Sequence, residues 1–284
     1  MSGQPVFAAA LEIARLYATG AAYRTGLYER LLRRSGVTRR DYANLMNYLK
    51  ASGRRPFPRR EFQDRFAAAD RVWQRLAIPD GASDEEHFEV WQRPEAGEYL
   101  LLSTTAKLSE YPLTTHRFIK HVPDGARVCE YGAGQAPITH AIRRFYKRKR
   151  LRVTIADIPT ESFKMAKYLF RADPWVDTID LEPGDDRPLT ETYDVIFCIT
   201  VFEHLPRPLA LAKHFHERLR PGGKLIFDYL RTEGVGVDLG AAARERELVL
   251  SFIRNHFAGE VNAECPGHFV VTKGVAHHPE PWCR

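Results

Sequence analysis

The feature that most constrains the fold is an alternation of short apolar runs with helical segments from residue 126 onward. Strands that alternate with helices form βαβ units, and such units build a parallel sheet covered by helices on both faces. We therefore predict a doubly wound α/β fold. The apolar runs fall at residues 126–131, 151–157, 176–181, 193–202, 222–230 and 268–275.

The first hundred residues have a different pattern, because their apolar residues recur at helical spacing. Tyr42, Leu45, Met46 and Leu49 follow an i, i+3, i+4, i+7 pattern, and residues 62–76 repeat it. Residues 1–20 also read as an amphipathic helix, since they lack the basic start of a signal peptide. We therefore predict a helical N-terminal region over 1–98 and an α/β domain over 99–284.

A glycine turn follows the first apolar run of the α/β domain. Gly132 and Gly134 stand two residues apart, and Ala136 occupies the place of a third glycine. In doubly wound sheets this first turn lies beside the ligand, at the carboxyl ends of the strands. The pattern alone is equally compatible with a nicotinamide dinucleotide, so an NAD(P)-dependent oxidoreductase remains an alternative.

Acidic residues at the ends of three apolar runs narrow the choice of ligand. Glu130 precedes the turn, where a carboxylate repels a pyrophosphate but suits a ligand with positive charge, such as S-adenosylmethionine (SAM) with its ammonium and sulfonium groups. Asp157 ends the second run and is expected to hold a ribose diol, the alternative being a helix N-cap. Asp180 and Leu181 close the third run; they either contact an adenine or belong to an ordinary loop.

Residues 193–230 complete a resemblance to a known family. Asp194 opens this stretch, Glu203-His204-Leu205-Pro206 follow the apolar run, and Pro221-Gly222-Gly223 precede the next run. Together with the glycine turn, this combination resembles class I SAM-dependent methyltransferases, and most closely the small-molecule group that includes the ubiquinone-biosynthesis methyltransferases. The resemblance covers about residues 100–275. It implies a Rossmann-like fold with a mostly parallel seven-stranded sheet, capped by the N-terminal helices.

The resemblance also implies roles for particular residues. SAM would be the cofactor, and a small molecule the methyl acceptor. His204 is the candidate catalytic base; alternatively it is a structural brace for its loop. Tyr99, Tyr111 and His116 are candidates for the acceptor pocket; alternatively they pack in the core. The expected cofactor-binding residues are Glu130, Tyr131, Gly132, Ala133, Gly134, Asp157, Ile158, Asp180, Leu181 and Ile199.

No metal ion is expected in this site. Some related enzymes carry a Glu-x-x-Glu-His metal motif in the loop that holds His204, but Thr200 stands at the first Glu position here. Glu203 and His204 alone are too few ligands for a dedicated divalent-cation site. We therefore expect metal-independent methyl transfer.

Charge and composition bear on partners and location. The net charge of +6 and the basic run at 143–152 leave an RNA or protein methyltransferase as an alternative, although a solvated helix end explains that run better. The sequence contains no apolar stretch of membrane-spanning length and no CxxC pair, so we expect a cytoplasmic protein that does not bind membranes. The N-terminal helices are a candidate homodimer surface. An inactive SAM-binding module is a further alternative.

Overall fold

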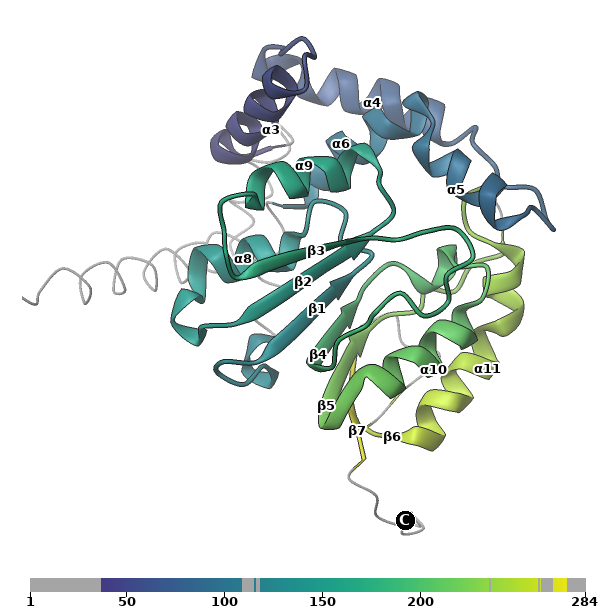
Figure 1. Ribbon diagram of the computed structural model, residues 1–284. Coiled ribbons are helices and arrows are strands. Elements are labelled where there is room, and N and C mark those ends of the chain that lie inside the picture. Colours follow the sequence, from purple (N-terminus) through teal and green to yellow (C-terminus); the bar gives the residue numbers. More distant parts are fainter. Residues whose placement is uncertain are drawn as a thin grey trace, which may run out of the picture.

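The computed structural model describes residues 37–108, 115, 118–234, 236–259, 261 and 268–274. Its centre is a seven-stranded sheet with the strand order β3-β2-β1-β4-β5-β7-β6 (Figure 1). The strands are β1 (Arg127–Tyr131), β2 (Arg152–Asp157), β3 (Val176–Asp180), β4 (Tyr193–Cys198), β5 (Leu219–Phe227), β6 (Phe257–Ala258) and β7 (Phe269–Lys273).

The predicted α/β fold with a mostly parallel sheet is confirmed. Strands β1 to β5 pair in parallel, whereas β7 runs antiparallel to β5 and β6 antiparallel to β7. The chain order reverses between β1 and β4, which pair directly, with Tyr131 opposite Cys198. Such a reversal opens a crevice at the carboxyl ends of the strands, where doubly wound proteins bind their ligands.

Helices cover both faces of the sheet, as the alternating pattern predicts. On one face, α8 and α9 bury Ile142 and Phe163 against Val128 and Phe197 of the strands. On the other face, α10 and α11 bury Phe215 and others against the opposite side of the same strands. The helices of the described chain are α3 (Arg39–Ala51), α4 (Phe62–Trp73), α5 (Asp84–Gln92), α6 (Pro94–Lys107), α8 (Pro137–Phe145), α9 (Glu161–Phe170), α10 (Pro208–Arg218) and α11 (Gly240–His256).

The N-terminal helices pack onto α9 and extend beside the carboxyl ends of the strands (Figure 1). Met165 of α9 is fully buried in a shared apolar cluster with Leu45 and Leu49 of α3 and Leu101 of α6. Helix α6 runs without a break through residues 98 and 99, where the sequence predicts a domain boundary. The expected helix at 1–20 lies outside the described residues.

Candidate active site

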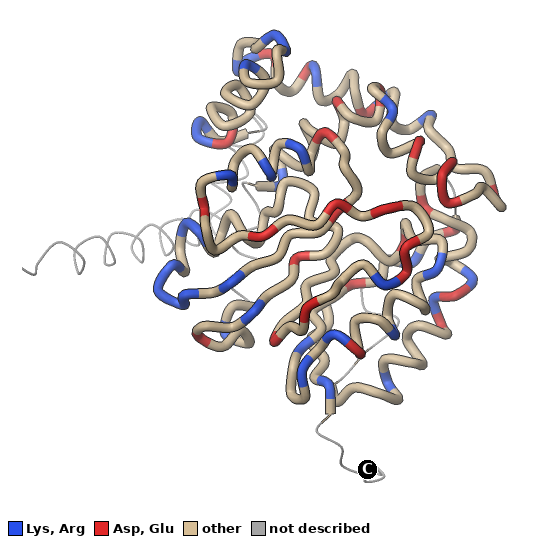
Figure 2. Tube along the Cα trace, viewed as in Figure 1, with Lys and Arg blue, Asp and Glu red and all other residues tan. Residues whose placement is uncertain are grey.

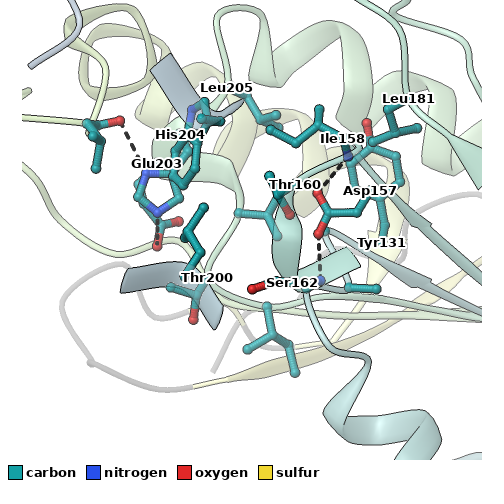
Figure 3. Close-up of a pocket in the computed structure, with 18 of the residues that line it drawn as sticks. Tyr131, Asp157, Ile158, Thr160, Ser162, Leu181, Thr200, Glu203, His204 and Leu205 are labelled. Carbon is teal, nitrogen blue, oxygen red and sulfur yellow. Dashed lines mark hydrogen bonds and ion pairs between the residues drawn. The ribbon is translucent and has the colours of Figure 1, made fainter. Parts of the chain in front are cut away.

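A cavity of about 440 Å³ lies at the carboxyl ends of β1, β2 and β4, at the reversal of chain order. Side chains from helices α4, α5 and α6 line its other side. Figure 3 shows Asp157, Ile158 and Leu181 at one end of this cavity and Glu203 and His204 at the other. The sheet and the N-terminal helices therefore each supply one wall of a single pocket.

The glycine turn forms part of the sheet wall and requires glycine for conformational and steric reasons. Gly132 and Gly134 have φ angles of 65° and 54°, in the left-handed region that side chains disfavour. A Cβ atom on Gly132 would lie 2.2 Å from Cγ2 of Val201, whereas one on Gly134 would meet Cγ2 of Thr104 at 3.4 Å. The close neighbour of Gly132 is therefore a side chain of the loop after β4.

Glu130 lies at the end of β1 and caps helix α8. Its carboxylate accepts hydrogen bonds from the backbone N–H groups of Ile138 (3.0 Å) and Thr139 (2.8 Å) and from the Thr139 hydroxyl (2.6 Å). Burial raises the pKa of Glu130 to about 7, and these hydrogen bonds oppose that rise. Glu130 borders the cavity, as expected, but most of its hydrogen-bonding capacity serves the helix start.

Asp157 joins the end of β2 to the glycine turn. Its Oδ2 accepts a hydrogen bond from the backbone N–H of Gly134 (2.5 Å), and its Oδ1 accepts one from the backbone N–H of Ile158 (2.7 Å). Burial raises its pKa to about 6. The N-cap of α9 is Thr160, whose hydroxyl accepts from the backbone N–H of Phe163, so the helix-cap alternative for Asp157 is wrong.

The remaining candidates on the sheet side divide between the cavity and the surface. Asp180 does not line the cavity; its carboxylate is half-exposed and pairs with the Lys167 ammonium at 2.7 and 2.9 Å. The structure thus places Asp180 as a surface acid. The candidates that do line the cavity beside Glu130, Asp157 and the two glycines are Tyr131, Ala133, Ile158, Leu181 and Ile199.

His204 lies at the opposite end of the cavity, with Asp238, Glu203 and Trp91 around its ring. Its Nδ1 atom is 3.0 Å from Oδ1 of Asp238, and its Nε2 atom is 3.9 Å from Oε1 of Glu203 (Figure 3). The ring of Trp91 meets the imidazole edge-on at a centroid distance of 5.1 Å. The side chain of His204 is 22% exposed, so it is held in place and still reachable from the cavity.

Aromatic side chains of the N-terminal helices form the wall facing the sheet. Tyr99 of α6 lines the cavity, as expected, and stacks on Trp73 of α4 at 4.6 Å, with 16° between the ring planes. Trp73 in turn contacts Trp91 of α5 at 5.3 Å. The other two acceptor-pocket candidates, Tyr111 and His116, lie outside the described residues.

Several lining residues were not predicted from the sequence. Trp73 has the helical spacing of a core residue, so the pattern predicts that it packs in the core. In the structure it packs against Tyr99 and also lines the cavity. His87 and Phe88 follow no pattern that points to a site. Asp238 lies in a loop 34 residues after His204, where no spacing rule connects the two.

The described residues offer no metal cluster and no membrane span. Among them, no three His, Cys, Asp or Glu side chains are grouped so that they could hold a metal ion. Metal-independent transfer stays a prediction. In the same part of the chain, no helix combines the length and the apolar character needed to cross a bilayer.

The comparisons with known proteins agree with the class that this fold and pocket define, the class I SAM-dependent methyltransferases. The family model described as "Methyltransferase domain" matches residues 105–266. The chain belongs to this family of methyltransferase domains. The oxidoreductase alternative is thereby set aside.

Similar curated proteins are ubiquinone biosynthesis O-methyltransferases. The chain is 29% identical over 138 residues to the one from Idiomarina loihiensis, which covers 46% of this chain and 54% of the relative. It is 26% identical over 130 residues to the one from Xanthomonas campestris, covering 43% and 50% respectively. The chain therefore spans about half the length of the curated relatives it matches.

Solved structures with a similar arrangement include two larger proteins. One is a pyocyanin biosynthetic protein (TM-score 0.48, 16% identity, covering 76% of this chain and 72% of that one). Another is a putative O-methyltransferase from Nostoc punctiforme (TM-score 0.49, 13% identity, covering 75% and 68%).

Proposed function

We propose that this chain transfers a methyl group from SAM to a small-molecule acceptor. The observation that carries the proposal is a single cavity with two chemically different ends. One end has the glycine turn and the carboxylate of Asp157, and the other has His204 beneath an aromatic wall. The names of the curated relatives support transfer to an oxygen atom.

The sheet side of the cavity fits SAM. Gly132 and Gly134 add no side chain of their own to the turn, and Asp157 keeps lone pairs beyond its two backbone hydrogen bonds. Ile158 and Leu181 offer apolar contacts for an adenine ring. Bound SAM supplies an activated methyl group on its positively charged sulfur.

On the acceptor side, His204 would remove the proton from the attacking hydroxyl group. Hydrogen bonding of Nδ1–H to Asp238 selects the tautomer in which the Nε2 lone pair is free to accept a proton. Trp91 restricts rotation of the ring, which keeps this atom in place. In methyl transfer the acceptor oxygen forms the new bond to carbon while the bond from carbon to sulfur breaks, and the released proton resides on His204. Asp238 acts here as a positioning residue.

The test compares His204→Ala with Asp238→Asn for methyl transfer and for SAM affinity. Loss of a general base should lower the rate about 10²–10⁴-fold. Asp238→Asn should lower kcat with little change in SAM affinity, because it replaces the charged acceptor beside Nδ1 of His204 with a neutral amide. If His204 is only a brace, SAM affinity and stability will fall together with the rate in both variants, and the assignment of His204 as base is then wrong.

A further inference from the structure

Glu203 is a buried acid whose carboxyl group accepts no hydrogen bond from the part of the chain that the structure describes. It lies in the short 3₁₀ turn Phe202–His204 after β4, and its side chain is 1% exposed. Neither of its carboxylate oxygens has a hydrogen-bond partner among the residues that the structure describes. Burial without hydrogen bonds is costly for a carboxyl group, and buried polar groups in native proteins are normally paired. Because Glu203 lines the cavity, a ligand in the cavity is the partner that its position suits.

The neighbours of Glu203 do not neutralise it. His204 is the nearest basic group, but its Nε2 atom is 3.9 Å away, beyond hydrogen-bond reach, and its Nδ1 atom is paired with Asp238. Asp228 and Asp238 add further negative charge around Glu203. A ligand group that donates hydrogen bonds and carries positive charge would therefore meet a favourable potential here.

The surface next to this acid is aromatic. Trp91 touches His204, and through Trp73 it continues into the stacked ring of Tyr99. Aromatic faces bind flat rings by stacking and also attract cations. The cavity therefore combines a surface for a planar ring with an adjacent carboxyl group that has no hydrogen bond from the described residues.

Most of the charged side chains that line the cavity have the same sign as Glu203. Seven carboxylate side chains line it, against one lysine and one arginine. The arginine, Arg207, is already held between Asp84 (2.9 Å) and Asp186 (2.7 Å). A carboxylated or phosphorylated acceptor would therefore find few free cationic partners in this pocket.

We propose that Glu203 anchors the methyl acceptor, and that the acceptor is a flat aromatic compound bearing a protonated amine. The ring lies against the aromatic wall formed by Trp73, Trp91 and Tyr99, and the ammonium group donates to the Glu203 carboxylate. This inference rests on the proposed function, since it names the substrate class for the same cavity.

The experiment measures binding of three matched probes by calorimetry to the full chain saturated with S-adenosylhomocysteine. Dopamine, 4-ethylcatechol and 3-(3,4-dihydroxyphenyl)propionate share one ring and differ in charge at the end of a short side chain. Dopamine should bind tightest and the carboxylate weakest, about tenfold or more apart, as expected for one hydrogen bond to a charged group. Glu203→Gln should bring dopamine close to 4-ethylcatechol.

Asp185→Asn is the matched control. It removes one negative charge from an exposed residue of the same cavity without touching Glu203, so the preference for dopamine should persist. Glu203→Asp keeps the charge but shortens the side chain, and should retain part of the preference. Thermal unfolding of each variant checks that it is folded.

Three outcomes would overturn the proposal. They are failure of the wild-type protein to bind any probe at millimolar concentration, equal or tighter binding of the carboxylate, and an unchanged preference in folded Glu203→Gln. S-adenosylhomocysteine binding is measured first and independently. If it is intact while one of these outcomes occurs, the acceptor class is wrong and the methyltransferase function stands; if it is absent, the proposed function itself fails.

Discussion

At the scale of single residues, Gly132 and Gly134 occupy similar places in the sequence motif but differ in the space around them. Replacing either by alanine should cost about 1–2 kcal/mol, because both have a left-handed backbone. Gly132→Ala should cost clearly more and weaken SAM binding, since the new Cβ would overlap Val201. Urea unfolding and calorimetry of Gly132→Ala and Gly134→Ala give the comparison.

A double variant identifies the cause of that difference. Val201→Ala removes the Cγ atoms that lie 2.2 and 3.2 Å from the added Cβ, so it should restore part of the stability lost in Gly132→Ala. It should do nothing for Gly134→Ala. If Gly132→Ala and Gly134→Ala lose equal stability, the left-handed backbone alone accounts for the cost and the contact with Val201 does not contribute.

A second residue-scale prediction concerns the ionisation of Glu203. Burial raises its pKa from 4.5 to about 7, so the folded state binds this proton more tightly than the unfolded state does. Between about pH 4.5 and 7 this group therefore lowers the free energy of unfolding as the pH rises, and the loss is complete above the folded pKa.

The difference between wild type and Glu203→Gln isolates this effect from those of other buried groups. Burial lowers the pKa of His87, His140 and His214, which act with the opposite sign, and raises the pKa of Glu130 and Asp157, which act with the same sign. In the ligand-free protein, the variant should gain stability relative to wild type on going from pH 5 to pH 8. Urea unfolding at the two pH values measures it. A difference that does not change with pH would contradict a raised pKa for Glu203.

The sequence located the acidic candidates but did not show which of them reach the cavity. Asp157 and Asp180 both end strands beside the expected ligand, yet only Asp157 reaches the cavity. Lys167, one turn from the end of α9, pairs with Asp180, and this partner depends on how α9 lies on the sheet. Asp238 has no sequence signal at all, because the folded loop alone brings it to His204.

At the scale of elements, the sheet and its helices could be predicted because their patterns are long. Strands β1, β2 and β4 are rich in apolar residues, and the helices between them carry apolar residues at helical spacing. Strand β6 could not be predicted, since its two residues at the end of α11 are too few to show a period. Of the aromatic wall only Tyr99 was a candidate; Trp73 and Trp91 were missed, because rings that line a pocket and rings in a core have the same spacing.

Arg207 ties helix α5 to the sheet domain through two ion pairs. This side chain bridges Asp84, the first residue of α5, and Asp186 in the loop after β3. Arg207→Ala should speed amide hydrogen exchange in α5, whereas global stability should change by no more than about 1 kcal/mol because the pair is partly exposed.

Arg220→Ala is the control for that variant. Arg220 pairs with Asp194 at the opposite ends of the strands and has a similar exposure, 45% against 39%. It should leave exchange in α5 unchanged. If Arg207→Ala also leaves α5 unchanged, packing of Trp91 rather than the ion pair holds the helix in place.

At the scale of the whole molecule, the N-terminal helices and the sheet domain share one core. Met165 of α9 is fully buried among residues of α3 and α6, and α6 itself crosses the predicted boundary at residue 98. Removing the N-terminal helices would expose this surface to water. We therefore expect one cooperative thermal transition, measured by calorimetry. Two separated transitions would show that the regions unfold independently.

The same core has a consequence for any exchange of the N-terminal region with a relative, the experiment that tests whether this region selects the acceptor. A junction at residue 95 would divide the first turn of α6 and mismatch the packing on α9. A junction within residues 79–83 leaves α5 and α6 intact, and among the described helices it exchanges α3 and α4, of which α3 must still match α9. Acceptor choice should then change while SAM affinity stays similar.

The neighbouring strands β1 and β4 also hold two reduced cysteines. Cys129 and Cys198 are fully buried on the same side of the sheet, and burial raises the pKa of both thiols. An alkylating reagent attacks only thiolate that it can reach, so neither sulfur can be modified until the central strands separate. The rate at which these two thiols are labelled therefore reports how often the protein opens globally. Mass spectrometry can measure this rate under native conditions. Ligands that bind in the crevice should slow the labelling.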